Sequence, residues 1–287
     1  MEKPSMPSVF IVILNYNGGD MLTICLNSVF RSDYSNLQLV VVDNNSEDGS
    51  FELAKKNFAR AHFIKNPTNF GFAKGNNIGI RFALEKFADY ILVLNNDTLI
   101  EASTISKLIQ ESTHNPSAGI ISPLILSGDG NKNWFAGGKI NWLNMRTAHI
   151  NKIFSQQPYS SEYITGCAML IRANVFEKIG LFDERFFLYY EDADFSLRAF
   201  KEGFSLLVAP QIKIKHFEQS SSNPAKLYWL VLSGLLFFKI HATFWQKIWM
   251  LFYLSARKIK NRVDLIFFNN FTAKEVHRAY QTFKKFK

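Results

Sequence analysis

VFIVILNYNGG, residues 9–19, is the stretch that decides the fold of this chain. An uninterrupted apolar run, rich in β-branched side chains, ends in a polar turn that contains two glycines. A continuous apolar run of this kind is typical of a parallel strand that is buried on both faces. Residues 20–30 then place their apolar side chains at helical spacing. The segment therefore predicts a buried strand followed by a helix.

The same pattern repeats along the first third of the chain. Predicted strands cover residues 37–42, 62–64 and 90–94, and predicted helices cover residues 51–58 and 72–87. Strands that alternate with helices indicate βαβ units and a parallel sheet. The expected fold class is therefore α/β, with the ligand beyond the carboxyl ends of the strands.

After residue 97 the alternation becomes less regular. The further predicted elements are helices over 100–114, 174–179 and 191–201, strands over 118–126, 168–171, 204–208 and 212–216, and hairpins in a Gly- and Trp-containing region over 128–142. Two apolar segments over 227–238 and 248–254 are too short to span a membrane alone, since a spanning helix needs about 20 residues. We expect a flexible tail over 1–7, a catalytic domain over 8–220 and a basic, aromatic-rich helical region over 221–287.

Composition and charge limit the class of protein. Apolar residues make up 47% of the chain, which excludes a disordered protein. The net charge of +9 is concentrated over residues 239–287 and indicates an anionic partner. Cys25 and Cys167 lie in apolar or small-residue segments, so we interpret both as reduced core residues. Residues 1–7 lack the apolar stretch of a signal peptide, which predicts a cytoplasmic location.

Polar side chains follow the predicted strands and should meet at one edge of the sheet. Asn15, Asp43, Asn66 and the run Asn95-Asn96-Asp97 all occupy such positions. Asp43 could accept from the N3–H of a uracil or thymine ring or from ribose hydroxyls, or it could be an inert turn residue.

The run Asn95-Asn96-Asp97 offers one carboxylate and two amide carbonyls to a hard cation. Mg²⁺ and Mn²⁺ typically take few protein oxygens and complete their shell with water and substrate phosphates. The alternative is an N-cap, in which Asp97 or Thr98 begins the next helix. His216, at the end of a strand with period-two alternation, is either a structural histidine or a metal ligand.

The acidic run Glu191-Asp192-Ala193-Asp194 is the candidate for base chemistry. Acidic residues are also favoured in the first turn of a helix, and Asp194 can pair with Arg198 one turn later. That structural interpretation does not explain why the aromatic segment 186–190 brings the acidic turn against apolar surroundings.

Glycines recur every four residues at Gly71, Gly75 and Gly79. Because glycine disfavours a helix interior by about 1 kcal/mol, this spacing indicates close helix packing or close approach of the backbone to a ligand. The dinucleotide pattern G-x-G-x-x-G is absent here and after the first strand, which disfavours a dehydrogenase.

Six motifs in order resemble inverting family 2 glycosyltransferases, most closely the rhamnosyltransferase-like subgroup. They are Val9–Asn17, Val41–Ser46, Asn69–Asn77, Leu94–Thr98, Thr165–Arg172 and Gly180–Asp194. The resemblance covers roughly residues 8–220 and implies a GT-A fold, a Rossmann-like nucleotide-diphospho-sugar transferase architecture. Two departures are that Asn95 and Asn96 stand where many relatives have an acidic first residue, and that Leu232-Ser233-Gly234 lacks the Arg-Asn pair of the subgroup.

The resemblance also implies roles for individual residues. Asp192, or its neighbour Glu191, is implied as the base, and Asp97 with His216 as the contacts to a divalent cation, Mg²⁺ or Mn²⁺. The implied nucleotide-sugar contacts are Asn15, Asn17, Asp43, Asn45, Asn69, Gly71, Lys74, Asn77, Asn96 and Gly166.

The function that the resemblance implies is inverting transfer of rhamnose or a hexose from a dTDP- or UDP-linked donor. The acceptor would be a hydroxyl of a bacterial surface glycan or lipid-linked oligosaccharide. The apolar segments 227–238 and 248–254, with tryptophans and basic residues beside them, predict peripheral attachment to the inner face of the membrane. We expect no nucleic-acid partner; a homodimer through the C-terminal helices is the alternative use of that region. The rival functions are a nucleotidyltransferase of the same broad architecture and a non-catalytic glycan-binding scaffold.

Overall fold

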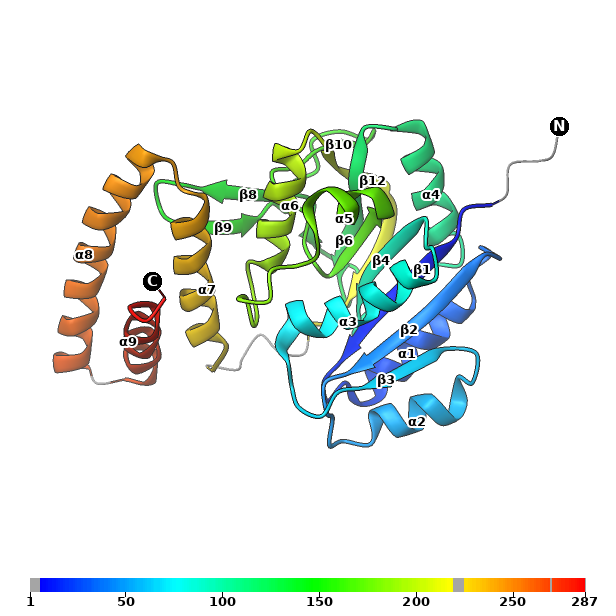
Figure 1. The fold of residues 1–287 in the computed structure, drawn as a ribbon, viewed down its shortest axis with the longest axis horizontal. Coiled ribbons are helices and arrows are strands. Elements are labelled where there is room, and N and C mark those ends of the chain that lie inside the picture. The colour runs from blue at the N-terminus through cyan, green and yellow to red at the C-terminus, as the bar shows by residue number, and fades with distance from the viewer. Residues whose placement is uncertain (1–5, 219–224, 269, 287) are drawn as a thin grey trace.

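The computed structural model describes residues 6–218, 225–268 and 270–286. The strands are β1 (Val9–Asn15), β2 (Leu37–Asp43), β3 (His62–Lys65), β4 (Tyr90–Asn95), β5 (Thr98–Leu99), β6 (Ala118–Ser127), β7 (Asn133–Phe135), β8 (Gly138–Asn141), β9 (Arg146–His149), β10 (Tyr159–Ser160), β11 (Ala168–Arg172) and β12 (Ser205–His216). The helices are α1 (Gly19–Phe30), α2 (Ser50–Asn57), α3 (Gly71–Glu85), α4 (Thr104–His114), α5 (Ala173–Ile179), α6 (Glu191–Lys201), α7 (Ala225–His241), α8 (Phe244–Phe267) and α9 (Phe271–Phe283). They form a mixed sheet flanked by helices, with α7 to α9 gathered at one end (Figure 1).

One sheet organises the described part of the chain. Its strand order is β10-β12-β6-β11-β4-β1-β2-β3, with β5 on β12 and β7 on β6. β1 is paired in parallel with β2 on one side and β4 on the other, which aligns Asn15 with Asp43. The predicted parallel half is therefore confirmed, and the polar residues after its strands meet at one edge.

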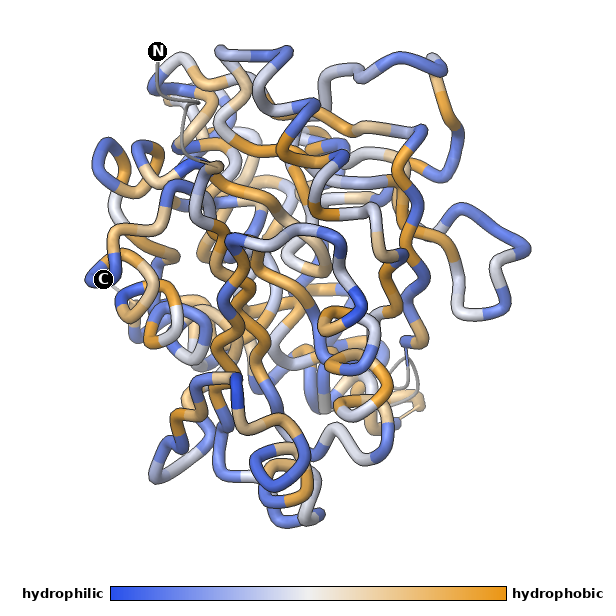
Figure 2. The backbone as a smooth tube through the Cα atoms, turned by 90° about the vertical axis from the view of Figure 1, so that its right-hand side faces the viewer, coloured by the Kyte–Doolittle hydropathy of each residue, from blue (hydrophilic) through white to orange (hydrophobic). Residues whose placement is uncertain are grey.

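The glycine repeat lets α3 lie close to the sheet. A Cβ on Gly75 would stand 2.5 Å from a methyl group of Leu14, and one on Gly79 would stand 2.5 Å from a methyl group of Val12. The spacing thus has the close-packing role that we expected of it. Hydrophobic stretches of the chain run through the middle of the molecule, and hydrophilic stretches are frequent in the loops at its periphery (Figure 2).

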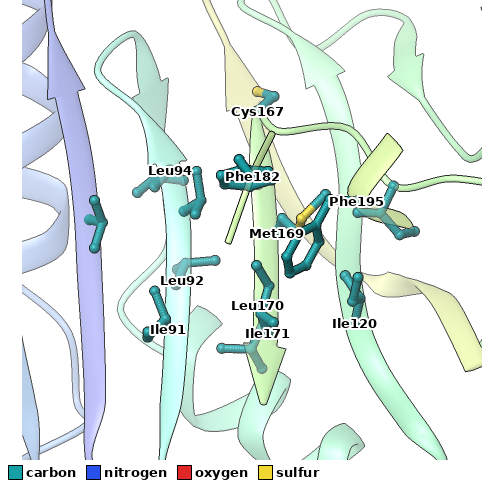
Figure 3. Packing of buried hydrophobic residues seen from close by; sticks show 14 of the residues in the cluster. Ile91, Leu92, Leu94, Ile120, Cys167, Met169, Leu170, Ile171, Phe182 and Phe195 are labelled. Atoms are coloured by element: carbon teal, nitrogen blue, oxygen red, sulfur yellow. The ribbon is translucent and has the colours of Figure 1, made fainter. Parts of the chain in front are cut away.

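The second half of the sheet is mixed. β11 runs antiparallel to both β4 and β6, whereas β12 is parallel to β6. Side chains of β4 and β11, including Leu94 and Met169, pack with Phe182 and Phe195, whose ring centroids are 4.8 Å apart (Figure 3). This core supports the segments that carry the acidic run.

Two boundaries differ from the sequence-based expectation. The helix expected from residue 100 begins at Thr104, because Thr98 and Leu99 form β5 and pair with the end of β12. Asp97 and Thr98 are therefore not the N-cap of that helix. The strands expected over 204–208 and 212–216 are one continuous strand, β12, with a register shift between Ala209 and Lys213 that accommodates Pro210.

The C-terminal helices pack on the catalytic part rather than standing apart. Leu235, Leu236, Phe237 and Phe238 of α7 belong to the same buried cluster as the sheet. The β8–β9 hairpin reaches away from the sheet towards α7 and α8 (Figure 1). The described helices include none that is both long and apolar enough to cross a membrane.

Candidate active site

The ends of β1 and β2 are joined by a buried hydrogen-bond network centred on Asn15. The Asn15 amide nitrogen donates to Asp43 Oδ1 at 2.8 Å and to the hydroxyls of Ser46 and Ser50 at 3.0 Å. Its oxygen accepts from Asn96 at 2.9 Å, which links β4 to the same network. The three strand ends are thus locked into one rigid edge.

Asp43 has no exposed surface, and both of its oxygens are occupied. Oδ1 accepts from the Ser46 hydroxyl at 2.6 Å as well as from Asn15, and Oδ2 accepts from the Ser46 N–H at 2.9 Å. These bonds fix the turn after β2, in which Asn45 has a left-handed φ of 62° and remains partly accessible. Asp43 therefore supports the donor side of the sheet edge through hydrogen bonds to Asn15 and Ser46.

A second set of amides joins this edge to the start of α3. Asn44 donates to Asn69 Oδ1 at 3.2 Å and to the Gly71 carbonyl at 2.9 Å, and the Gly71 N–H donates back to Asn69. Gly71 has φ +77° and lies against Phe187, where a side chain would collide. The Phe72 N–H donates to the Phe187 carbonyl at 2.7 Å, so α3 begins in direct contact with the segment that leads to the acidic run.

Asn77 and Lys74 are placed differently from the strand-end amides. The Asn77 side chain accepts from the Phe182 N–H and donates to the Phe182 carbonyl and to Glu184. It therefore holds the 182–184 segment against α3. Lys74, half-buried, places its ammonium 4.1 Å from the centre of the Phe70 ring.

Asp97 and His216 meet because β5 pairs with the end of β12. The register sets His216 opposite Thr98 and leaves Asp97 Oδ1 3.1 Å from His216 Nε2. Asp97 Oδ1 and His216 Nδ1 are buried atoms without a hydrogen-bond partner. Asp97 Oδ1 and His216 Nε2, which lie side by side, suit a divalent cation that takes its other ligands from water and phosphate; the unpartnered Nδ1 is the other ring nitrogen. The described residues contain no group of three or more such side chains, so the protein's share of a metal site would be small.

Aromatic rings and a further carboxylate surround this pair. The Trp134 ring lies 4.4 Å from His216 and 4.5 Å from His149, centre to centre. Its indole N–H donates to Glu218 at 3.1 Å. The Gly- and Trp-containing region therefore forms one wall beside His216. Sequence reasoning did not select Glu218, although its place two residues after His216 could have suggested it.

The acidic run begins α6 and is presented by two strained residues. Tyr189 and Tyr190 both have left-handed backbone angles, φ 69° and 67°. A left-handed backbone conformation costs about 1–3 kcal/mol at each residue that is not glycine. It persists only where contacts with the surrounding structure hold the residue in place. The turn leaves Glu191 buried at 4% exposure and Asp192 partly exposed.

The two neighbouring carboxyl groups differ in their partners. Asp192 accepts from the Gly166 N–H at 3.0 Å and from the Ala193 N–H at 2.7 Å, whereas Glu191 Oε2 is buried without a partner. Burial raises the pKa of Asp192, and those hydrogen bonds act in the opposite direction. Burial, followed by the charges of Asp192 and Asp194, raises the pKa of Glu191 well above its usual range. The net pKa of Asp192 is raised and that of Glu191 is raised further, so Glu191 is the group that keeps its proton to higher pH and partly exposed Asp192 is the one that ionises first.

The two carboxylate centres are connected through the start of β11. Gly166 holds Asp192, and the carbonyl of the next residue, Cys167, accepts from the Asn95 N–H at 2.9 Å. Burial raises the pKa of the Cys167 thiol, and the charges of Asp97 and Asp192 add to the effect. Both carboxylates therefore lie near the same short segment, on one side of the sheet edge.

Helix α7 packs directly behind residues 187–190, the turn that precedes the acidic run and that is called the catalytic turn in the proposals below. The Trp229 ring stacks on Phe187 at 4.3 Å, and the Ser233 hydroxyl donates to the Leu188 carbonyl at 2.8 Å. Gly234 leaves room for the Tyr190 ring, which a Cβ there would approach to 3.1 Å. The segment that departs from the subgroup pattern, Leu232-Ser233-Gly234, thus supports the turn.

A buried ion cluster completes this support. Asp194 Oδ2 accepts from Arg198 at 2.8 Å, as the i,i+4 spacing predicted, and Asp194 Oδ1 lies 2.7 Å from His241 Nε2. His241 is the last residue of α7, so the pair ties the end of that helix to the first turn of α6. Both oxygens of Asp194 are therefore paired within this cluster, and Asp192 and Glu191 are the carboxyl groups of the run that remain as candidates for the base.

These features define a class. A mostly parallel sheet whose strand ends carry amides and carboxylates, extended by mixed strands that hold a second acidic turn, is the GT-A fold. The solved structures agree: GalNAc-T7 with UDP, GalNAc and Mn²⁺ has a TM-score of 0.65 at 18% identity over 80% of this chain and 48% of that one. The mannosyltransferase PcManGT from Pyrobaculum calidifontis, with GDP-Man and Mn²⁺, has a TM-score of 0.61 at 13% identity over 100% and 92%.

Residues 10–180 match the description Glycosyl transferase family 2, and the chain belongs to that family. It is 32% identical to the low-salt glycan biosynthesis hexosyltransferase Agl10 of Haloferax volcanii, over 72% of this chain and 66% of that protein. It is 30% identical to the dTDP-rhamnosyl transferase RfbF of Shigella flexneri, over 73% and 69%. The N-acetylglucosaminyl-diphospho-decaprenol L-rhamnosyltransferase of Mycobacterium tuberculosis is 23% identical over 74% and 77%. These matches confirm the family, the GT-A fold and the glycosyltransferase class expected from the sequence.

Proposed function

We propose that the protein moves rhamnose or a hexose, with inversion, from a dTDP- or UDP-linked donor to a hydroxyl of a surface glycan or lipid-linked oligosaccharide. The observation that carries this proposal is the partly exposed Asp192, whose carboxylate is held by two backbone N–H groups beside a buried Glu191 with a raised pKa. A relative named as a dTDP-rhamnosyl transferase supports the donor class. A relative named for a diphospho-decaprenol acceptor supports a lipid-linked one.

In this mechanism Asp192 takes the proton from the acceptor hydroxyl while that oxygen attacks the anomeric carbon. The bond from the anomeric carbon to the nucleoside diphosphate breaks in the same displacement. General base catalysis contributes roughly 10²–10⁴-fold, so positioning must supply much of the remaining acceleration. The Gly166 and Ala193 N–H groups orient the carboxylate, and the absence of a side chain at Gly166 makes room for the Phe72 ring, which a Cβ there would approach to 3.0 Å.

The donor would occupy the edge formed by the ends of β1, β2 and β4. Asn96 and the turn at Asn45 are partly exposed there, buried Asn15 supports this edge from within, and Asp97 with His216 would hold a divalent cation. When bound, such a cation supplies positive charge opposite the departing diphosphate. Two GT-A structures that contain Mn²⁺ with UDP or GDP-Man support this assignment.

The test is a thermal-shift and hydrolysis screen with dTDP-rhamnose, UDP-hexoses, dTTP and free glycans, each with Mn²⁺ and with chelator. A ligand that binds only the native state adds about 2.7 kcal/mol of stability at 100 times its dissociation constant. We expect a shift with one nucleotide sugar, larger with Mn²⁺, and slow release of free sugar. A shift with dTTP, and release of diphosphate when a sugar 1-phosphate is added as the acceptor of the nucleotidyl group, would indicate a nucleotidyltransferase. A shift with glycan alone would indicate a binding scaffold.

We further propose that helix α8 attaches the protein to the cytoplasmic membrane surface. Its inner side buries Met250, Leu254 and Asn261. Apolar side chains that are 43–76% exposed recur along the opposite side: Trp245, Phe252, Ile259, Val263 and Ile266. Basic residues border this stripe, Arg262 on one flank and Lys260 on the other. An apolar stripe with basic borders is what interfacial helices present to anionic lipid.

Vesicle flotation tests this attachment. We expect the full-length protein to float with anionic vesicles, to float less with neutral vesicles, and to detach as salt rises, since each basic residue near an anionic surface adds about 1 kcal/mol. Phe252→Glu with Ile259→Glu should abolish flotation, whereas Phe200→Glu, an equally exposed change on α6, should not. A protein that ignores anionic vesicles and sediments as a dimer through α8 would contradict the proposal.

A further inference from the structure

A cavity of about 630 Å³ lies beside the catalytic turn and outside the donor edge. It is enclosed by α7, α8, α9 and residues 144–147 at the tip of the β8–β9 hairpin. The volume falls within the range of about 300–1,000 Å³ that small-molecule sites occupy. None of the elements proposed to hold the nucleotide sugar contributes to its wall, so the donor does not account for it.

The wall combines apolar bulk with two cations. Leucine, valine, methionine and phenylalanine side chains from α7 and α8 form most of it, for example Leu235 and Met250. Arg146 from the hairpin and Arg257 from α8 are its charged members, and the described lining residues include no acidic side chain. The ligand that suits this wall is an amphiphile with an anionic head and an apolar chain. A purely apolar ligand would leave Arg146 and Arg257 without an anionic partner, and a purely anionic ligand would leave the apolar side chains without an apolar partner.

The cavity is coupled to the catalytic turn through Tyr190. This residue lines the cavity, receives a 3.4 Å hydrogen bond from the Thr147 N–H, and stands two positions before Asp192. Its left-handed backbone is part of what presents the acidic run. A ligand in the cavity would therefore contact Tyr190, the residue whose backbone conformation positions Asp192.

Helix α8 contributes to both the cavity and the proposed membrane face. Met250, Leu254 and Arg257 line the cavity, while the exposed apolar stripe lies on the other side of the same helix.

We propose that the cavity binds the diphosphate and the first isoprenoid units of a lipid-linked acceptor. Arg146 and Arg257 hold the diphosphate, and the apolar wall from α7 and α8 holds the chain. The acceptor sugar, attached to that diphosphate, is then presented near Asp192. This inference rests on the proposed glycosyl transfer and names the part of the acceptor that the protein recognises.

The experiment is isothermal titration of the full-length protein with farnesyl diphosphate, in chelator and with saturating dTDP to fill the donor edge. We expect saturable binding, at least tenfold weaker binding of farnesol and of inorganic diphosphate, and at least tenfold weaker farnesyl diphosphate binding by Arg146→Glu and by Arg257→Glu. Leu230→Trp, which narrows the cavity without a charge change, should weaken binding as well. The matched control is Arg60→Glu, an exposed arginine between α2 and β3, elements that lie at the opposite end of the molecule from α8 (Figure 1); this variant should bind as the wild type does.

Each result decides between defined alternatives. Farnesyl diphosphate that is displaced by dTDP, or that binds all four variants equally, overturns the assignment to this cavity. Absence of farnesyl diphosphate binding in a protein that still binds dTDP-sugar overturns the cavity proposal and leaves the proposed transferase function intact. Failure to bind any nucleotide sugar in the screen above counts against the transferase function itself.

Discussion

Glu191→Gln tests whether a neutral acid stands beside the base. Glu191 is 4% exposed, its Oε2 has no partner, and its pKa is raised by burial and by the neighbouring carboxylates. The unfolded chain releases this proton near pH 4.3, whereas the folded protein retains it to higher pH. A raised pKa in the folded state means that stability is fully present below the unfolded value and is lost as the pH rises through the folded value.

The size of the effect follows from proton linkage. Between those two pKa values the wild type loses about 1.4 kcal/mol of unfolding free energy per pH unit from this group, and glutamine cannot titrate. The free-energy advantage of Glu191→Gln should therefore grow with pH and then level off. Because the native group is neutral where glutamine mimics it, turnover should stay within a few-fold of the wild type.

Urea denaturation of both proteins at about pH 5, 6, 7 and 8 measures the difference directly. A difference that does not change with pH would refute the raised pKa. A difference that shrinks as the pH rises would mean that the fold stabilises the carboxylate. Loss of turnover in Glu191→Gln, with Asp192→Asn still active, would move the base by one residue.

Three further predictions concern the donor edge and the packing around it. Asp97→Ala should weaken donor binding only when Mn²⁺ is present. Asp43→Ala removes the carboxylate that accepts hydrogen bonds from Asn15 and Ser46, so it should weaken dTDP or UDP binding with or without metal. Calorimetry with and without Mn²⁺ separates the two variants, and identical losses of affinity would point to misfolding. His241→Ala should lower the unfolding free energy by about 2 kcal/mol, since it removes a buried hydrogen bond to a charged group; an unchanged urea midpoint would show that Arg198 alone satisfies Asp194. Gly79→Ala should cost about 1–2 kcal/mol, because steric overlap with Val12 and Val42 outweighs the gain in helix propensity; a stabilised variant would show that α3 can shift outward.

The sequence was sufficient to predict the parallel half of the fold. Buried strands such as β1 and β2 are continuous apolar runs, and that local signal survives without tertiary information. It was also sufficient to select the acidic turn, because carboxylates beside aromatic residues have no simple structural explanation. Asp97 and His216 were selected separately, and only the β5–β12 pairing, which spans more than a hundred residues of sequence, brings them to 3.1 Å.

Other features depended on contacts that the sequence does not display. The α7 segment was interpreted as a surface for membranes, yet Leu235–Phe238 are buried, and the exposed stripe belongs to α8. Strong hydrophobicity around the whole of α7 predicts burial as readily as membrane contact, so composition could not decide. The support of Tyr190 by Gly234 and the cavity beside it arise from the packing of distant helices.

The central claim, that Asp192 is the base and does not bind the donor, is tested most directly by one comparison. Asp192→Asn and the wild type are measured side by side for sugar transfer and for calorimetric binding of the same dTDP- or UDP-linked donor. Asparagine preserves the shape of the side chain and can still accept from Gly166, so the turn should persist. The account predicts loss of transfer by at least about 10²-fold, with donor affinity within a few-fold of the wild type. Transfer at near wild-type rate by Asp192→Asn would contradict it.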